Sequence, residues 1–230
     1  MKYVLSVGIN KYRKSVFGSI DLEQCVNDSN RFNNKIQCNE LCQLLDEQAT
    51  KSEIIANLKY YASICKSGDT FIYFQSSHGT DHKNPKGEIM TGRVTHDNVL
   101  WDFEFLNLLS LFPKGCNVVT LSDCCHAESN SREVLPFGYK VKSIKTTLAP
   151  TEGSTSKVRS NCYFIAACKF DSVSLETDNG GMFTNALLNS LATPTWKTLI
   201  KQIKKETSGN QTPVIECIKT TNKLNLPHLL

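Results

Sequence analysis

Three observations predict an α/β fold built on a single, mainly parallel six-stranded sheet with helices on both faces. Apolar and β-branched runs of strand length recur along the chain and alternate with segments of helical spacing. Two of these runs stop abruptly in small, polar and reactive side chains, as strands do at the ligand-binding edge of an open α/β sheet. The length of 230 residues, with 40% apolar content, suits one large domain. We therefore predict a single domain over residues 1–230.

The expected strands are short and rich in branched aliphatic or aromatic residues. They cover Lys2–Ile9, Leu41–Leu45, Asp69–Gln75, Val118–Leu121, Cys162–Cys168 and Pro213–Ile218. The expected helices lie at Cys25–Ile36, Thr50–Cys65, Asp102–Leu111, Met182–Leu191 and Thr195–Lys205. Thr50 has the character of an N-cap, because Glu53 three residues on completes a capping box. Residues 79–98 and 128–160 are predicted to be loops.

Composition argues against several classes of function. A formal net charge of +4 is mild for this length, and the lysines are scattered, so a nucleic-acid surface is not expected. No apolar segment reaches the length of a membrane span, and no secretory leader precedes the first strand. Several of the ten cysteines lie in apolar runs, and the set lacks zinc-site spacing. We therefore expect a reduced, cytoplasmic chain without structural zinc.

A histidine and a pair of cysteines follow two of the predicted strands. His78 comes directly after the run that ends near Gln75, and Cys124 and Cys125 follow the run that begins at Val118. If the two strands are parallel neighbours, these side chains meet at one edge of the sheet. An imidazole that takes the proton of a thiol makes the thiolate that attacks a carbonyl carbon. The sequence thus predicts a Cys-His dyad with His78 as the base.

The residues around the dyad suit the same chemistry. Gly79 lets the backbone approach a reacting carbonyl, so its N–H and that of the nucleophile are predicted to stabilise an oxyanion. Neighbouring side chains at a strand end point in opposite directions, so only one of Cys124 and Cys125 can face His78. The interval from His78 to Cys125 is close to the roughly fifty residues found in caspases.

The motifs resemble those of the caspase-like cysteine peptidases of clan CD, family C14, and specifically the metacaspases and their bacterial relatives, the orthocaspases. Residues 123–127, Asp-Cys-Cys-His-Ala, are similar to the family motif Asp-Cys-Cys-His-Ser, in which the cysteine before the histidine is the nucleophile. Residues 76–79 are similar to Ser-Gly-His-Gly, and further matches extend over nearly the whole chain. The resemblance implies the caspase-hemoglobinase fold, cysteine endopeptidase activity and Cys125 as the nucleophile.

The resemblance also assigns the pocket for P1, the residue before the scissile bond. It places Cys25, Asp28, Ser76 and Asp123 there. Two carboxylates beside the nucleophile would attract a Lys or Arg side chain through charge-assisted hydrogen bonds. Cleavage of protein or peptide substrates after Arg or Lys is therefore implied, whereas the motif of the caspases that cut after Asp is absent. Taken singly, Asp28 would also suit a helix N-terminus and Asp123 an Asx-type strand end.

Two features depart from the family pattern. Ser77 replaces the usual glycine and Ala127 the usual serine, and both keep the residue small. The acidic segment that binds Ca²⁺ in many metacaspases is short here and leaves Asp97, Asp102 and Glu104, of which Asp102 fits best. A calcium site needs about six to eight oxygen ligands. Nothing in the sequence therefore indicates a required cofactor, and Ca²⁺ stays a candidate activating ion.

Two other functions compete with a regulated intracellular protease of cell death, stress or immunity. A catalytically silent signalling or scaffold module of the same fold would be expected to lose the cysteine, the histidine or a pocket acid, and this chain keeps them all. A nucleotide-binding domain has poor support, because Gly8 belongs to no GxGxxG motif or P-loop.

Residues 128–160 are expected to form a mobile loop that controls the enzyme. The segment is polar and without a sustained period, and it contains the basic residues Arg132, Lys140, Lys142, Lys145, Lys157 and Arg159. These side chains suit the predicted pocket, so we expect self-cleavage after one of them once an activating ion, small ligand or partner protein orders the loop. The alternative is a solvated surface loop without a regulatory role.

Overall fold

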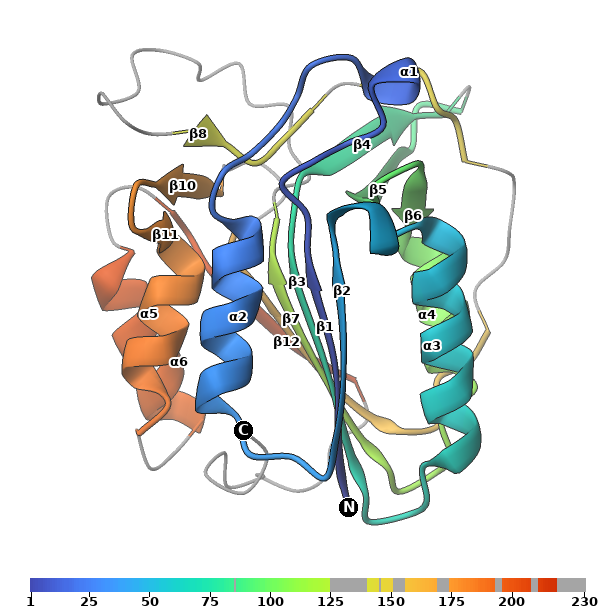
Figure 1. Cartoon of the computed structure of the whole chain (residues 1–230). Coiled ribbons are helices and arrows are strands. Elements are labelled where there is room, and N and C mark those ends of the chain that lie inside the picture. The colour runs from blue at the N-terminus through green and yellow to red at the C-terminus, as the bar shows by residue number, and fades with distance from the viewer. Residues whose placement is uncertain are drawn as a thin grey trace.

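The central feature of the computed structural model is a six-stranded sheet with the strand order β12-β9-β7-β3-β1-β2 (Figure 1). The structure describes residues 1–84, 86–124, 140–144, 146–150, 156–168, 174–192, 196–207 and 211–218. The sheet comprises β1 (Lys2–Gly8), β2 (Glu40–Leu45), β3 (Thr70–Ser76), β7 (Asn117–Asp123), β9 (Asn161–Ala166) and β12 (Val214–Ile218). Neighbouring strands run parallel except β12, which is antiparallel to β9. The predicted fold class is confirmed.

Helices cover both faces of this sheet (Figure 1). One face carries α2 (Cys25–Lys35), α5 (Met182–Ser190) and α6 (Trp196–Glu206), and the other carries α3 (Lys51–Ile64) and α4 (Asp102–Leu109). Side chains alternate along β3, so Phe74 stacks on Phe32 of α2 with ring centroids 4.4 Å apart. Its neighbour Tyr73 faces Phe105 of α4 at 5.0 Å. Each face therefore has its own buried apolar cluster.

The boundaries of the predicted elements lie within two residues of those in the structure. Thr50 caps α3 as expected, because its Oγ1 accepts a hydrogen bond from the Glu53 N–H at 3.2 Å. Asp28 lies in the first turn of α2. None of the helices in the described part of the chain has the length and apolar character needed to cross a membrane.

Two small three-stranded sheets lie at the end of the molecule where the parallel strands end (Figure 1). In one, β4 (Gly79–Lys83), β5 (Ile89–Val94) and β6 (Val99–Trp101) pair antiparallel, so the prediction of a loop over residues 79–98 is wrong. These strands are short and β4 is polar, so they depend on pairing with one another and, for β5 and β6, on packing against α4 rather than on local propensity. In the other, β8 (Lys140–Val141), β10 (Leu175–Thr177) and β11 (Gly180–Gly181) pair antiparallel, with β8 inside the segment predicted as a mobile loop. The short elements α1 (Lys14–Phe17) and η1 (Asp46–Gln48) lie in the connections that follow β1 and β2.

Candidate active site

The carboxyl ends of β1, β3 and β7 lie side by side. Gly8, Ser76 and Asp123 are register partners on these three adjacent strands. The first turn of α2 packs against Gly8, where a Cβ atom would lie only 2.5 Å from the carbonyl oxygen of Cys25. Glycine at this position therefore lets α2 bring Cys25 and Asp28 close to the strand ends.

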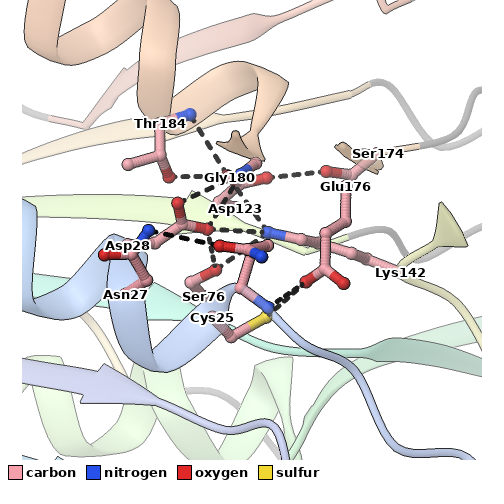
Figure 2. Close-up of polar contacts among 12 residues, drawn as sticks. Cys25, Asn27, Asp28, Ser76, Asp123, Lys142, Ser174, Glu176, Gly180 and Thr184 are labelled. Atoms are coloured by element: carbon pink, nitrogen blue, oxygen red, sulfur yellow. Dashed lines mark hydrogen bonds and ion pairs between the residues drawn. The ribbon is translucent and has the colours of Figure 1, made fainter. Parts of the chain in front are cut away.

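Asp28 and Asp123 line one buried polar pocket (Figure 2). Asp28 accepts hydrogen bonds from the Ser76 hydroxyl at 2.8 Å and from the Gly181 N–H at 3.0 Å. Asp123 accepts from the N–H and the hydroxyl of Thr184 at 3.1 and 2.6 Å. Because each carboxylate is fixed by hydrogen bonds from other elements, the two negative charges are held facing one space.

The side chain of Lys142 fills this space (Figure 2). Its ammonium group lies 3.2 Å from Asp28, 3.3 Å from Asp123 and 2.8 Å from the Ser76 hydroxyl, and the side chain is fully buried. A Cβ atom at Gly181 would lie 2.6 Å from the Lys142 nitrogen, so glycine there leaves room for the ammonium. Burial acts to lower the pKa of Lys142, but the charge of Asp123 and further acidic neighbours hold that pKa well above its usual value. Burial raises the pKa of Asp28, and the Lys142 charge opposes that change.

A third carboxylate, Glu176 of β10, lies beside Cys25. Its oxygens accept hydrogen bonds from the Glu23 and Gln24 N–H groups at 2.9 and 3.0 Å, at the N-terminus of α2 where the helix dipole favours negative charge. The Cys25 thiol donates to the same carboxylate, with 3.6 Å between sulfur and oxygen. Burial raises the pKa of Cys25 well above its usual value, so this thiol is a neutral donor and not a nucleophile.

His78 lies two residues beyond the end of β3, and a hydrogen bond to its ring fixes its tautomer. Its Nε2 lies 2.6 Å from the carbonyl oxygen of Ile20, and because a carbonyl can only accept, Nε2 carries the proton. Nδ1 has no hydrogen-bond partner among the described residues. The His78 N–H donates to the Tyr12 hydroxyl at 2.8 Å, which fixes the backbone. Burial lowers the pKa of His78 to about 4; the Ile20 carbonyl opposes that change and the Lys142 charge adds to it. The imidazole is therefore neutral at pH 7.

Gly79 donates its N–H to the carbonyl oxygen of Lys142 at 2.9 Å. The predicted nucleophile and second oxyanion donor, Cys125, lies outside the described residues, which end at Cys124 in this segment and resume at Lys140. Cys124 is fully buried. The predicted oxyanion donor Gly79 thus already faces a peptide carbonyl next to His78.

The candidate calcium ligands lie elsewhere and have partners of their own. Asp102 pairs with Arg93. Glu104 lies 2.8 Å from the Lys51 ammonium, and Asp97 accepts from the Lys51 N–H at 2.9 Å. Within the described ranges, no group of three or more His, Cys, Asp or Glu side chains is placed to hold a metal ion. Each of these three carboxylates is therefore engaged by a group of the protein itself.

The structure brings together all the residues predicted for the P1 pocket and sets His78 and Gly79 beside them. The sequence analysis did not assign Ile20, Glu176, Gly181 and Thr184 to the site. It named Lys142 only as one of several basic residues of the segment 128–160 that suit an acidic pocket. Gly181 and Thr184 lie in residues 180–184, which resemble a family motif, whereas nothing in the local sequence around Ile20 or Glu176 points to the strand ends that they meet.

Comparison with known proteins gives a family match and several relatives. The family model of the caspase domain, Peptidase_C14, matches residues 1–225. Metacaspase-1 of Scheffersomyces stipitis is 25% identical over 168 residues, which cover 62% of this chain and 39% of that protein. Metacaspase-1 of Meyerozyma guilliermondii is 26% identical over 167 residues, covering 62% and 38%. The match spans about two fifths of the length of these relatives.

A solved structure shares the fold of the whole chain. Protein GSU0716 from Geobacter sulfurreducens superposes with a TM-score of 0.84 and covers 100% of this chain and 99% of its own. The two sequences are 19% identical, so this likeness concerns the fold alone.

Proposed function

The chain belongs to the caspase-domain family of cysteine peptidases, and we propose that it is an active endopeptidase that cuts protein substrates after lysine or arginine. The observation that carries the specificity is the ammonium group held between Asp28 and Asp123. An acidic P1 side chain would meet like charges in this pocket, and an apolar one would leave two buried carboxylates without a counter-ion. A basic side chain satisfies both carboxylates.

The proposed dyad is Cys125 with His78 as its base. Nδ1 of His78 takes the thiol proton, because Nε2 already donates to the Ile20 carbonyl. Ile20 acts as a positioning residue, since it selects the tautomer in which Nδ1 is the free lone pair. The N–H groups of Gly79 and Cys125 stabilise the oxyanion that forms when the thiolate attacks. We propose that this chemistry proceeds without Ca²⁺ at Asp102, whose carboxylate is paired with Arg93.

Fluorogenic peptides that end in Lys, Arg, Asp or Leu test this function. We expect hydrolysis of the Lys and Arg peptides alone. Cys125→Ala should reduce it to background, because no thiolate remains to attack, whereas Cys124→Ala should retain substantial activity. The released fluorophore is measured for each purified variant, with circular dichroism as a check on folding. Efficient cleavage after Asp would contradict the pocket assignment, and an inactive Cys124→Ala beside an active Cys125→Ala would contradict the choice of nucleophile.

A further inference from the structure

We infer that Ser77 and Gln75 are positioning residues, which hold the Gly79 N–H in the direction that an oxyanion donor needs. This role rests on the proposed function, because the Gly79 N–H stabilises an oxyanion only if the chain is a peptidase. It goes further by naming two side chains that act on the reaction without touching the substrate. Both side chains are fully buried at the carboxyl end of β3.

The Gly79 N–H belongs to the same peptide group as the His78 carbonyl. This peptide group is trans, so the N–H and the carbonyl point in opposite directions. On one side, the Gly79 N–H donates to the Lys142 carbonyl at 2.9 Å. On the other side, the His78 carbonyl accepts from the Ser77 hydroxyl at 2.9 Å and from the Val94 N–H at 3.0 Å. The groups that fix the His78 carbonyl therefore fix the direction of the Gly79 N–H.

Val94 of β5 determines the direction of the hydrogen bonds around this carbonyl. The Val94 carbonyl can only accept, so the Gln75 atom that lies 3.3 Å from it is the amide nitrogen. That nitrogen also donates to the Ser77 oxygen at 2.8 Å, which leaves the Ser77 hydroxyl proton for the His78 carbonyl. Because the Val94 N–H donates to the same carbonyl, the hydrogen bonds close into a ring. The ring holds the His78 carbonyl in one orientation.

Tyr73 connects this ring to the core of the protein. Its hydroxyl donates to the side-chain oxygen of Gln75, and its aromatic ring packs on Phe105 of α4 with centroids 5.0 Å apart. Burial raises the pKa of Tyr73, so the hydroxyl stays protonated and remains a donor. Hydrogen bonds thus run in one direction from Tyr73 through Gln75 and Ser77 to the His78 carbonyl, and donors in such a series strengthen one another.

Serine at position 77 departs from the motif that residues 76–79 resemble, which has glycine there. A glycine would leave the His78 carbonyl with the Val94 N–H and would remove an acceptor from the Gln75 amide. Side chains alternate at a strand end, so Ser76 points the other way and donates to Asp28 in the P1 pocket (Figure 2). One strand end therefore serves the P1 pocket on one face and the oxyanion donor on the other.

Steady-state kinetics on Lys peptides test this role, because an oxyanion forms only on the way to the transition state. In Ser77→Ala, kcat should fall about tenfold and KM should stay within about twofold, a smaller loss than the factor of about 10² to 10³ for removal of a donor. Ser77→Thr keeps the hydroxyl and should retain most of kcat. Tyr73→Phe should lower kcat about threefold in the wild type and leave it unchanged in Ser77→Ala, where the series is already broken.

Hydrogen exchange of the Gly79 amide, followed by NMR, measures the same alignment without catalysis. In Cys125→Ala, this amide should be protected by its hydrogen bond to the Lys142 carbonyl. Addition of Ser77→Ala should speed its exchange about tenfold. Ser6→Ala is the matched control, because it also removes a buried serine hydroxyl, one that lies 2.7 Å from the Ser29 hydroxyl. It should lower the free energy of unfolding but leave kcat and Gly79 exchange unchanged.

The outcomes separate this inference from the proposed function. A Ser77→Ala variant that is destabilised like Ser6→Ala but keeps its kcat and its Gly79 exchange overturns the inference, because the ring would then only satisfy buried polar groups. If Ser77→Ala does not fold, Tyr73→Phe removes a single oxygen and decides by the same two measurements. A wild type that hydrolyses no Lys or Arg peptide rejects the proposed function, and Gly79 exchange then still decides whether Ser77 holds this peptide group.

Discussion

Two buried cations, Arg93 and Lys142, occupy different kinds of site. Arg93 of β5 pairs with Asp102, nine residues along the chain, and its guanidinium lies 4.1 Å over the ring of Phe105. Lys142 meets Asp28 across 114 residues of sequence, and it reaches the pocket from the two-residue strand β8. The first cation is fixed by near neighbours in the sequence, whereas the second arrives from a distant segment.

The carboxylates around the two cations differ as well. Asp102 is a third exposed and meets one guanidinium, so charge is balanced locally. Asp28 and Asp123 are fully buried and share one ammonium, with Glu176 acting from nearby. A lysine from a substrate could replace Lys142 without changing the charge of the pocket, whereas Arg93 is part of the paired strand β5 and packs on Phe105 of α4. We therefore interpret the Arg93 pair as part of the fold and the Lys142 pair as an occupied binding site.

Matched Asp→Asn variants should separate the two sites most strongly. Asp28→Asn should lower kcat/KM for Lys and Arg peptides by a factor of about 10² or more, because a desolvated cation loses a charged partner. Asp102→Asn should leave kcat/KM unchanged but lower the free energy of unfolding by on the order of 2 kcal/mol, because Arg93 stays buried without its counter-ion. Steady-state kinetics and urea unfolding measure the two effects. Equal loss of activity in both variants would contradict the distinction.

The sequence was sufficient to predict the central sheet and the half of the site that is formed by the strand ends and α2. Strand runs that stop in reactive residues predicted where His78 and Asp123 lie, since a parallel sheet brings its carboxyl ends to one edge. Asp28 came from resemblance to a family motif, because a carboxylate in the first turn of a helix is also common without function. The prediction of the site therefore succeeded where a regular parallel sheet places chemically distinctive residues at one edge.

The other half of the site depends on the pairing of short strands, which cannot be predicted from the local sequence pattern. β8 and β10 have only two and three residues, and their register sets Lys142 in the pocket and Glu176 beside Cys25. Likewise Ile20 acts through its carbonyl, and any residue type could supply that oxygen. The prediction of a loop over residues 79–98 is wrong for the same reason, because the polar strand β4 is stabilised by its pairing with β5.

The two cations should also differ in their effect on the titration of His78. The pKa of His78 is lowered to about 4 from 6.5, so the unfolded chain binds this proton first as the pH falls. The free energy of unfolding should therefore decrease between pH 6.5 and 4 by roughly 3 kcal/mol from this group and stay level in that respect below pH 4. In the uncleavable Cys125→Ala background, Lys142→Ala should raise the pKa of His78, because a nearby positive charge is removed and water gains access.

NMR titration of the His78 ring and urea unfolding across this pH range measure the effect. Asp102→Asn is the control, and it should leave the His78 titration in place, while His78→Gln should remove this component of the pH dependence. A His78 pKa that does not rise in Lys142→Ala would show that Lys142 does not act on the dyad.

A third cation, Lys140, differs from both because it is exposed to solvent. Its ammonium group lies 2.5 Å from the Glu23 carboxylate, but the two side chains are 44% and 65% exposed. The Lys140 hydrogen bond lowers the pKa of Glu23, so the carboxylate is charged at neutral pH. If residues 140–142 lie as a substrate, a lysine two positions before P1 should meet Glu23 in any substrate. Exposed ion pairs contribute little, so Lys-Val-Lys peptides should exceed Ala-Val-Lys peptides in kcat/KM by only about twofold to fivefold.

This preference should fall as salt is added, because exposed charges are screened. It should disappear in Glu23→Ala and persist in Glu47→Ala, a control at an exposed glutamate of η1. Kinetics on the two peptides at low and high salt provide the measurement. A preference that survives Glu23→Ala would mean that Lys140 does not mark a substrate position, and β8 would then be bound through Lys142 alone.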